Sequence, residues 1–481
     1  MGHKDYKEIF DNIYGYIRMP RIYYNLIINT PQFHRLQHIK QMGLTNYVYP
    51  GAMHTRYSHS LGVYWIIKKM ITARNDILKD SQIRRLELAA LLHDIGHVPL
   101  SHTIEKALSK FEELERPNKE AQSEDLLGKI ELVHMEKNIK PIQTNPKPDK
   151  LHEKLGAEVI RYSGISEALK RIDIRPEEIG LIIRGTTTVG EVDIKEISNI
   201  NDISKSLVVY RNFMHSQLDA DRIDYLMRDA TFTGVKAGIV DIDKLLNEIY
   251  YDQDGNYGVK VGALRALEQF FSARLSAYSQ IPFNKHVHGF ELMASKLYYN
   301  LLCNEDKRAF DYNTIVSWMK EGEWDKWQRF TDYYFYWLIE QIKDDSKYNG
   351  QQTSKLALNL FRGCKLEVIH FEQQFCTPSE WDAYTQRIES KIKLLEENKQ
   401  QISKKVGISE EDIIIDTTST DMINAVEDPL FIYFDGYKLN VANSHETFLS
   451  SMAGKRLYIR RAFTFEARAK EKIRHILGLD K

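Results

Sequence analysis

An apolar stripe over residues 63–71 is the feature that most constrains how this chain can fold. Its members recur at positions i, i+3, i+4, i+7 and i+8, which places them on one face of an α-helix. They are Val63, Ile66, Ile67, Met70 and Ile71. Helical spacing returns over about residues 82–92 and 217–229 and dominates the first 300 residues. We therefore predict a mainly α-helical fold.

The chain has 481 residues, more than the roughly 250 to 300 at which one hydrophobic core stops growing. A charged, Pro-containing stretch at about residues 110–150 interrupts the helical patterns and is predicted to be a mobile insertion. We predict a core over residues 1–305 and, over residues 306–481, a C-terminal α+β subdomain with a regulatory or oligomerisation role.

The predicted subdomain begins with a long helical pair that includes residues 331–342 and 379–402. Strands follow at residues 412–416, 429–434, 437–441 and 455–461, before a last helix from about Phe463. In the core, a short hairpin is predicted at residues 248–261, with Asp254-Gly255 as its turn.

Composition excludes several classes of protein. The 66 Lys and Arg residues balance 67 Asp and Glu residues, so net charge does not draw the chain to nucleic acid or to a membrane. Three scattered cysteines provide neither a disulfide framework nor a Cys-rich zinc site. Without a signal-like segment or a run of 18 apolar residues, the protein is expected to be soluble and cytoplasmic.

Imidazole and carboxylate groups gather at three places. Four of them fall within ten residues, at His93, Asp94, His97 and His102. His59 precedes Val63 by four residues and continues the buried stripe, and Asp221 begins a row with Tyr225 and Asp229 at i+4 and i+8. A lone buried histidine is more often a core residue, and a carboxylate row is usually solvated.

Together these groups have the chemistry of a metal site. Imidazole and carboxylate ligands suit a divalent Mn, Fe, Zn, Ni or Mg ion. Two histidines with two aspartates leave coordination positions open, as a catalytic site requires. A metal so held activates water and polarises a phosphoryl oxygen, which phosphoester hydrolysis needs.

Three motifs in order make the hypothesis more specific. RYSHSLGV (residues 56–63), HDIGHVPLSH (93–102) and LDADRIDYLMRD (218–229) resemble the H…HD…D pattern of the HD-domain superfamily. More narrowly, they resemble the deoxynucleoside triphosphate triphosphohydrolases, some of which carry a sterile-alpha-motif domain that is absent here. The resemblance covers roughly residues 15–300, and residues 33–63 are similar to the family almost throughout.

The resemblance implies a role for each site residue. The metal ligands are His59, His93, Asp94 and Asp221. His97 and His102 lie around the α-phosphate, with His102 as the general acid, and His152 is a further active-site histidine. Glu105, three residues after His102, orients its imidazole. His134 is an alternative to His152 for this last role, because a long insertion follows His102 and His134 lies within it.

The resemblance also implies the substrate contacts. Arg56 meets the α-phosphate, and Arg222 meets the triphosphate chain. Tyr225 lies under the sugar, where a 2′-hydroxyl would collide, and Gln41 and Asp229 bind the 3′-hydroxyl. Further phosphate and sugar contacts are Arg274 and Tyr278. Alternatively, Arg56 and Arg222 form ordinary ion pairs on a helix surface, and Tyr225 packs in the core.

The predicted function is metal-dependent hydrolysis of deoxynucleoside triphosphates, with dGTP as a candidate preferred substrate, to deoxynucleoside and inorganic triphosphate. The resemblance implies a homo-oligomer, a tetramer or hexamer, with an activating nucleotide at its subunit interfaces. One alternative is another HD phosphohydrolase, acting on nucleoside monophosphates, cyclic nucleotides or guanosine alarmones. Another is a nucleotide-binding sensor whose HD site is not catalytic.

Overall fold

A computed structural model describes residues 5–74, 78–115, 150–185, 200–252, 256–386, 390–423 and 428–479. Most of the predicted insertion, including His134, lies outside these residues, as does the Asp254-Gly255 turn. Within them, no helix has both the length and the apolar character needed to cross a membrane.

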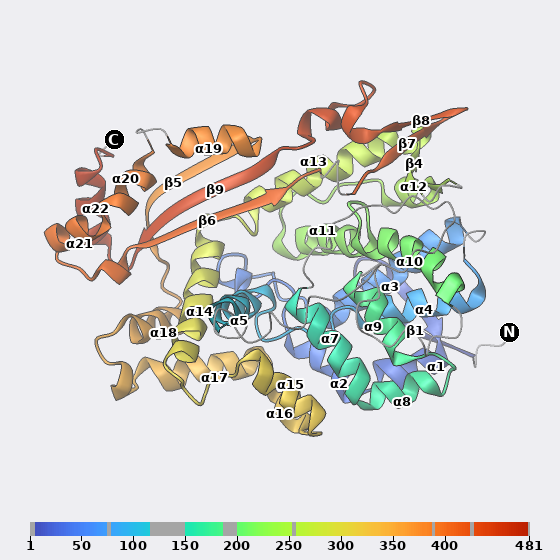
Figure 1. Cartoon of the computed structure of the whole chain (residues 1–481), viewed down its shortest axis with the longest axis horizontal. Coiled ribbons are helices and arrows are strands. Elements are labelled where there is room, and N and C mark those ends of the chain that lie inside the picture. The colour runs from blue at the N-terminus through green and yellow to red at the C-terminus, as the bar shows by residue number, and fades with distance from the viewer. Residues whose placement is uncertain are drawn as a thin grey trace, which may run out of the picture.

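Helices make up most of the structure (Figure 1). The helices of the first 305 residues are α1 (Arg21–Tyr23), α2 (Pro31–His34), α3 (Arg56–Ala73), α4 (Asp80–Leu92), α5 (His102–Glu115), α7 (Leu151–Tyr162), α8 (Gly164–Lys170), α9 (Pro176–Arg184), α10 (Ile200–His215), α11 (Ala220–Thr233), α12 (Ile242–Asn247), α13 (Leu264–Gln280) and α14 (Lys285–Cys303). Those that follow are α15 (Tyr312–Lys320), α16 (Trp324–Arg329), α17 (Asp332–Lys343), α18 (Gln352–Arg362), α19 (Pro378–Gln386), α20 (Lys391–Glu397), α21 (Lys399–Val406) and α22 (Ala467–Ile476).

The three predicted helices of the core are confirmed as α3, α4 and α11. The whole apolar stripe of α3 is buried. α11 begins at Ala220 instead of residue 217, because the side chain of Asp219 caps it by accepting a hydrogen bond from the Arg222 N–H. It ends where Gly234 takes a left-handed conformation with φ of 76°.

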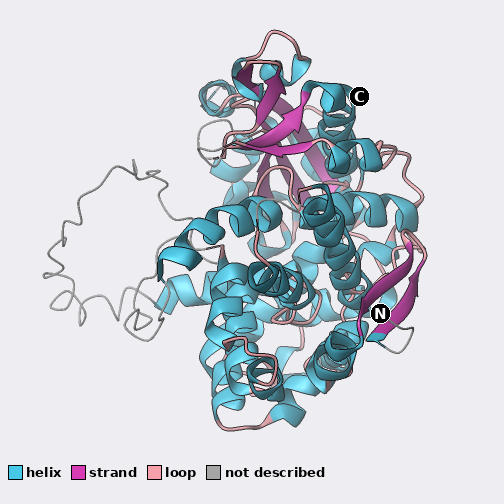
Figure 2. Cartoon of the chain, turned by 90° about the vertical axis from the view of Figure 1, so that its right-hand side faces the viewer, coloured by secondary structure: helices cyan, strands magenta, loops and turns pink. Residues whose placement is uncertain are grey.

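Three small sheets complete the fold (Figure 2). An N-terminal antiparallel hairpin pairs β1 (Tyr6–Asp11) with β2 (Gly15–Pro20). A second sheet has the order β3-β4-β7-β8, from β3 (Ile249–Tyr251), β4 (Tyr257–Lys260), β7 (Phe431–Phe434) and β8 (Tyr437–Asn440). The third has the order β5-β9-β6, from β5 (Glu367–Cys376), β9 (Arg456–Thr464) and β6 (Ile414–Asp421).

Contacts cross the predicted boundary near residue 305. β4, from the first part of the chain, pairs in parallel with β7 from the second. Gly258 of β4 permits this approach, since a Cβ there would lie 1.9 Å from the Phe431 carbonyl oxygen. One hydrophobic cluster also runs from Ile17 to Phe463. The division into two parts stays a prediction, and the parts share a sheet and a core.

Four local features differ from the prediction. The hairpin β1–β2 and the ten-residue strand β5 were not predicted, and β9 extends to Thr464, past the predicted start of the last helix. The predicted helix over residues 379–402 is divided among α19, α20 and α21, with Ser390 capping α20 through its side chain. Ser390 is buried and also donates to Glu372, so tertiary contacts override the helical spacing here.

Candidate metal centre

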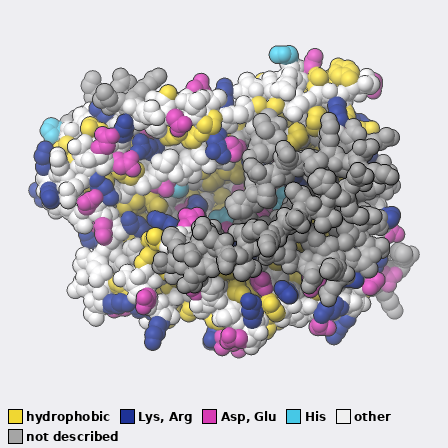
Figure 3. Space-filling model, in the orientation of Figure 1, with side chains coloured by type: hydrophobic (Ala, Val, Ile, Leu, Met, Phe, Trp, Pro, Cys, Tyr) yellow, Lys and Arg dark blue, Asp and Glu magenta, His cyan; other side chains and the backbone are white. Residues whose placement is uncertain are grey.

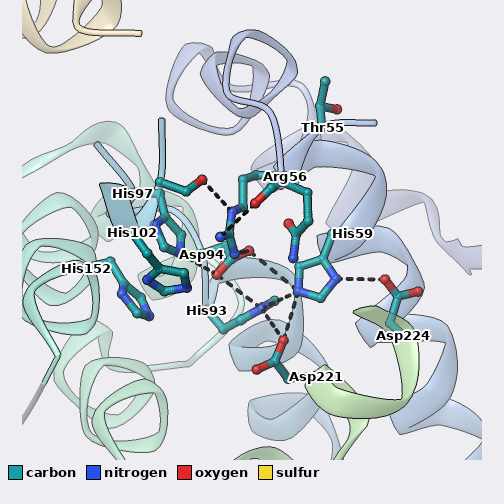
Figure 4. Close-up of polar contacts among 12 residues, drawn as sticks. Thr55, Arg56, His59, His93, Asp94, His97, His102, His152, Asp221 and Asp224 are labelled. Carbon is teal, nitrogen blue, oxygen red and sulfur yellow. Dashed lines mark hydrogen bonds and ion pairs between the residues drawn. The ribbon is translucent and has the colours of Figure 1, made fainter. Parts of the chain in front are cut away.

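Helix ends bring the four predicted metal ligands together (Figure 4). His59 lies in the first turn of α3, and Asp221 lies in the first turn of α11. His93 and Asp94 directly follow the last residue of α4. Because α3 packs against both α4 and α11, side chains from the three helices meet at one point. On the face of the molecule drawn in Figure 3, histidine and acidic side chains lie recessed near the middle.

The distances suit one shared cation. The Nε2 atom of His59 lies 3.0 Å from Asp221 Oδ1, 3.6 Å from Asp94 Oδ2 and 3.3 Å from His93 Nε2. His93 Nε2 lies 3.3 Å from Asp94 Oδ1 and 4.0 Å from Asp221 Oδ1. Two ring nitrogens and two carboxylates thus surround a small volume.

The outer ring nitrogens show which atoms are free to coordinate. His59 Nδ1 lies 2.7 Å from Asp224 Oδ2, and His93 Nδ1 lies 2.8 Å from the carbonyl oxygen of Ala90. Both partners only accept, so each Nδ1 is a donor, and the Nε2 atom of each ring is the one that faces the centre and can coordinate a metal. This arrangement is the one that metal-binding histidines use. The residues present therefore fit a divalent metal ion.

Electrostatics keep the carboxylates charged. Burial alone raises the pKa of Asp94, but the Arg56 guanidinium and neighbouring imidazoles bring the pKa well below its usual value. Burial lowers the pKa of His59, and hydrogen bonds to Asp221 and Asp224 outweigh it, raising the pKa to about 10. Such affinity for a proton shows that the site attracts positive charge.

Arg56 connects the metal centre to the neighbouring loops. Its NH1 donates to Asp94 Oδ2 at 2.8 Å, its Nε donates to Ser101 Oγ at 3.0 Å, and its NH2 donates to the Gln41 carbonyl oxygen at 3.3 Å. Arg56 is buried, so it orients Asp94 directly. Its predicted α-phosphate contact stays a prediction.

A second group of imidazoles lies beside the metal ligands. Glu105 accepts hydrogen bonds from Nδ1 of His102 at 2.7 Å and from Nδ1 of His152 at 2.9 Å. The rings of His97 and His152 are stacked with centroids 4.1 Å apart, and His97 Nε2 lies 3.1 Å from Asp94 Oδ1. The structure therefore brings His152 to the site, while its competitor His134 lies outside the described residues.

Exposure and pKa distinguish these histidines. Burial and the positive charge of Arg56 hold the pKa of His97 well below its usual value, so His97 is neutral. Loss of hydration to the surrounding protein also lowers the pKa of His102, although Glu105 opposes the shift. The His102 side chain is 54% exposed, whereas that of His97 is fully buried. His102 is thus the histidine that a substrate can reach.

The loop between His97 and His102 is held in an unusual conformation. Leu100 and Ser101 have φ of 54° and 53°, in the left-handed region that non-glycine residues avoid. Asp332, at the start of α17, accepts hydrogen bonds from the N–H groups of Leu100 at 2.8 Å and Lys40 at 3.0 Å. A residue from the C-terminal part of the chain therefore shapes this loop.

Two residues predicted to bind the 3′-hydroxyl lie on either side of His54. The Gln41 N–H donates to the His54 carbonyl oxygen at 3.0 Å, and Asp229 Oδ1 lies 2.8 Å from His54 Nε2. The Gln41 Oε1 atom is buried and has no hydrogen-bond partner within the described part of the chain. An acceptor left in this state is suited to a ligand hydroxyl.

Other predicted substrate residues have partners within the protein. The hydroxyls of Tyr225 and Tyr278 lie 3.3 Å apart. Arg222 donates to Asp219 and to the Ser216 carbonyl oxygen. Arg274 donates to the carbonyl oxygens of Met422 at 2.9 Å and Asp421 at 3.3 Å. The roles predicted for Arg222 and Arg274 stay predictions, and in this structure both guanidinium groups bind the chain itself.

Several residues of the site were not predicted. They are Asp11, His54, Asp224, Arg228 and Asp332. The i, i+4 spacing of Asp224 and Arg228 offered one signal, but it equally fits a solvated ion pair on a helix surface. Their burial depends on partners far away in the sequence.

Comparison with known protein families agrees with this site and its helical surroundings. Residues 56–226 match the family model of the HD domain, a range that contains all four candidate ligands. This part of the chain is therefore similar to the HD domain.

Among curated proteins, an uncharacterized protein of Mycoplasma genitalium, MG461, is 31% identical over 260 residues, covering 53% of this chain and 50% of that protein. The deoxynucleoside triphosphate triphosphohydrolase SAMHD1 of Bos taurus is 29% identical over 246 residues, covering 48% of this chain and 36% of that enzyme. The chain thus spans half or less of the length of these two relatives.

A solved structure extends the similarity to almost the whole chain. A phosphohydrolase from Bacteroides thetaiotaomicron superposes with a TM-score of 0.64 at 20% sequence identity, covering 95% of this chain and 100% of that one. At this identity the likeness concerns the fold. The fold therefore includes the C-terminal helices and strands as well as the HD domain.

Proposed function

We propose that this protein hydrolyses deoxynucleoside triphosphates to deoxynucleoside and inorganic triphosphate, with a divalent metal bound by His59, His93, Asp94 and Asp221. The observation that carries the proposal is the convergence of these ligands beside His102, the exposed imidazole that Glu105 holds. Sequence similarity to an enzyme with this activity supports the substrate class. A metal in this position supplies water activation and polarises a phosphoryl oxygen.

The protein's own groups complete the chemistry at the α-phosphate. Arg56 holds Asp94 and places positive charge next to the position of the equatorial oxygens. His102 donates a proton to the departing 5′ oxygen, and Glu105 orients its ring through Nδ1. The negative charge of a bound triphosphate raises the pKa of His102, which burial lowers in the free protein. His102 is then protonated when substrate is present.

The face of α11 supports a deoxyribose substrate. Asp221, Tyr225 and Asp229 are spaced by four residues, so they form a row about 12 Å long at 1.5 Å per residue. One end of the row meets the metal ligands, and the other meets His54, near Gln41. The predicted order along the substrate, from phosphate to sugar, is the order of these residues on the helix.

Chromatography of the reaction products tests the proposal. The purified full chain is incubated with each dNTP singly and with all four together, in the presence of Mn²⁺, Mg²⁺, Fe²⁺, Ni²⁺ or Zn²⁺. The mixture includes any nucleotide that acts as an activator at interfaces of a tetramer or hexamer. Inorganic triphosphate and deoxynucleoside are expected. Absence of triphosphate under every condition refutes the proposal.

The same experiment separates the alternatives. Another HD phosphohydrolase would be identified by phosphate from nucleoside monophosphates, by a nucleoside monophosphate from cyclic nucleotides, or by pyrophosphate from guanosine alarmones, without triphosphate from any dNTP. Asp94→Asn is expected to abolish turnover while the protein still folds. A matched control is Asp344→Asn, whose carboxylate is 73% exposed. If function instead survives Asp94→Asn, the site belongs to a sensor and is not catalytic.

A further inference from the structure

A buried chain of charged groups joins His59 to the N-terminal hairpin. Asp224 Oδ2 accepts from His59 Nδ1 at 2.7 Å and from Arg228 Nε at 2.8 Å, and Asp224 Oδ1 accepts from Arg228 NH2 at 3.0 Å. Arg228 NH1 donates to Asp11 Oδ2 at 2.9 Å. The side chains of Asp224 and Arg228 are fully buried, and that of Asp11 is 4% exposed.

Asp11 is itself fixed by the turn of the hairpin. Its other oxygen, Oδ1, accepts hydrogen bonds from the N–H groups of Ile13 at 2.9 Å and Tyr14 at 3.1 Å. These residues lie between β1 and β2. The hairpin therefore presents one carboxylate oxygen to Arg228 in a defined orientation.

The negative charge of this chain needs positive charge at the His59 ring. Two carboxylates and one guanidinium leave one negative charge buried beside His59, on the side of the ring opposite to Nε2. Buried charge is costly without a counter-charge. A divalent cation at Nε2 supplies that counter-charge through the imidazole, and a carboxylate behind a histidine strengthens it as a ligand.

Asp224 and Arg228 pack closely against α3 at Gly62. Gly62 lies on α3, one turn after His59, and a Cβ at this position would lie 1.9 Å from Asp224 Oδ1 and 2.5 Å from Arg228 NH2. The absence of a side chain at residue 62 therefore allows α11 to bring the Asp224–Arg228 pair against His59.

We propose that Asp224 is a positioning residue that fixes His59 with its proton on Nδ1, and that Arg228 and Asp11 extend this control to the hairpin, so that the hairpin contributes to metal affinity. The inference rests on the proposed function only for the presence of a metal at His59. It makes no assumption about the substrate.

Calorimetric titration of the metal-free full chain with Mn²⁺ or Zn²⁺ tests the effect on affinity. Asp224→Asn is expected to weaken binding about 10- to 100-fold, because the amide keeps only one acceptor oxygen, so its N–H₂ group must face a donor of Arg228 or of His59. Asp11→Asn keeps an acceptor for the turn and turns its amide N–H₂ toward Arg228, and a smaller loss is expected. The matched control is Asp306→Asn, a buried carboxylate that binds Arg308 and Tyr348. Its metal affinity is expected to stay within twofold of the wild-type value.

Gly62→Ala tests the same contact without changing a polar group, and weaker metal binding is expected. Its control is Gly180→Ala in α9, where the new Cβ would meet Ala157 Cβ at an ordinary 3.4 Å. If Asp224→Asn does not fold, Gly62→Ala and Asp11→Asn still decide the question. Unchanged affinity in both, or an equal loss in Asp306→Asn, overturns the proposal.

The state of the His59 ring gives a readout that needs no metal. In ¹⁵N-labelled metal-free protein, the long-range ring spectrum of His59, assigned by its loss in His59→Gln, is expected to show a proton on Nδ1. Asp224→Asn is expected to lower the proton occupancy of Nδ1, while Nε2, which lies 3.0 Å from Asp221 Oδ1, stays protonated. A wild-type ring with its proton on Nε2 alone overturns the positioning role. If the wild-type protein binds no metal but shows the expected ring, the proposed function fails and the positioning role of Asp224 stands.

Discussion

Asp332 offers the sharpest test of how the C-terminal part of the chain supports the site. Its two carboxylate oxygens accept from the N–H groups of Leu100 and Lys40. In Asp332→Ala, both buried donors lose their partner, and each such loss costs about 1–3 kcal/mol. The sum is therefore about 2–6 kcal/mol.

One opposing effect narrows this range. Burial raises the pKa of Asp332 even though two N–H groups stabilise its charge, so the carboxylate carries a desolvation cost that the substitution removes. We therefore expect the free energy of unfolding to fall by about 2–4 kcal/mol, the lower part of the range for two unpaired donors. Asp332→Asn keeps one acceptor oxygen, and about half of that loss is expected.

Urea denaturation, followed by circular dichroism, measures both variants. The loop adds a second readout, because the left-handed residues Leu100 and Ser101 store about 1–2 kcal/mol each. Once its anchor is removed, the loop relaxes and moves His102, so activity should fall even where the variant is fully folded. A loss of stability below about 1 kcal/mol in Asp332→Ala, far less than two unpaired donors cost, would refute this reasoning, as would equal losses in the two variants.

Three further predictions concern charge and metal. Glu105→Gln should lower kcat by about 10²-fold with little change in KM, because an amide cannot accept from both His102 and His152. Steady-state kinetics measures this effect, with Glu340→Gln as a surface control, and an unchanged kcat in Glu105→Gln would contradict the prediction. Removing the metal with a chelator should lower Tm, since an ion present at 100 times its Kd stabilises the fold by about 2.7 kcal/mol, and an unchanged melting curve would argue against a bound ion. Burial opposes ionisation of Asp416, but its bond to His288 prevails and lowers the pKa to about 2. A lowered folded-state pKa stabilises the protein above the unfolded value of about 3.9, so this stability should be lost as pH falls from about 5 towards 2, and Asp416→Asn should flatten the profile.

The helices that carry the site could be predicted from the sequence because their patterns are local. The stripe of α3 fixed the inward face of His59, and the spacing of Asp221, Tyr225 and Asp229 placed them on one face of α11. The partners of these residues could not be predicted from the sequence. Asp224 is buried only because His59 is its partner 165 residues away, and Asp332 meets Leu100 across 232 residues. No periodicity records such pairings.

Strand geometry was predictable in part for the same reason. The strands β7 and β8 flank a two-residue Asp-Gly turn, which gives a hairpin a local signature. β5 alternates only weakly between buried and exposed positions, and its register with β9 shifts between Val368 and His370. Its pairing is set by β9, almost 90 residues later, as their register implies.

The parallel pairing of β4 with β7 has a consequence for how the protein is made. Synthesis proceeds from the N-terminus at about 5–20 residues per second, and domains normally fold as they emerge. Here β4 pairs with β7, which is synthesised more than 170 residues later, and the His97–His102 loop lacks its hydrogen bond until Asp332 has been made. A nascent chain that ends after the HD domain therefore exposes an unpaired strand edge, which invites aggregation. Expression of residues 1–305 alone should yield insoluble protein, whereas in the full chain β7 covers the edge of β4 only near the end of translation.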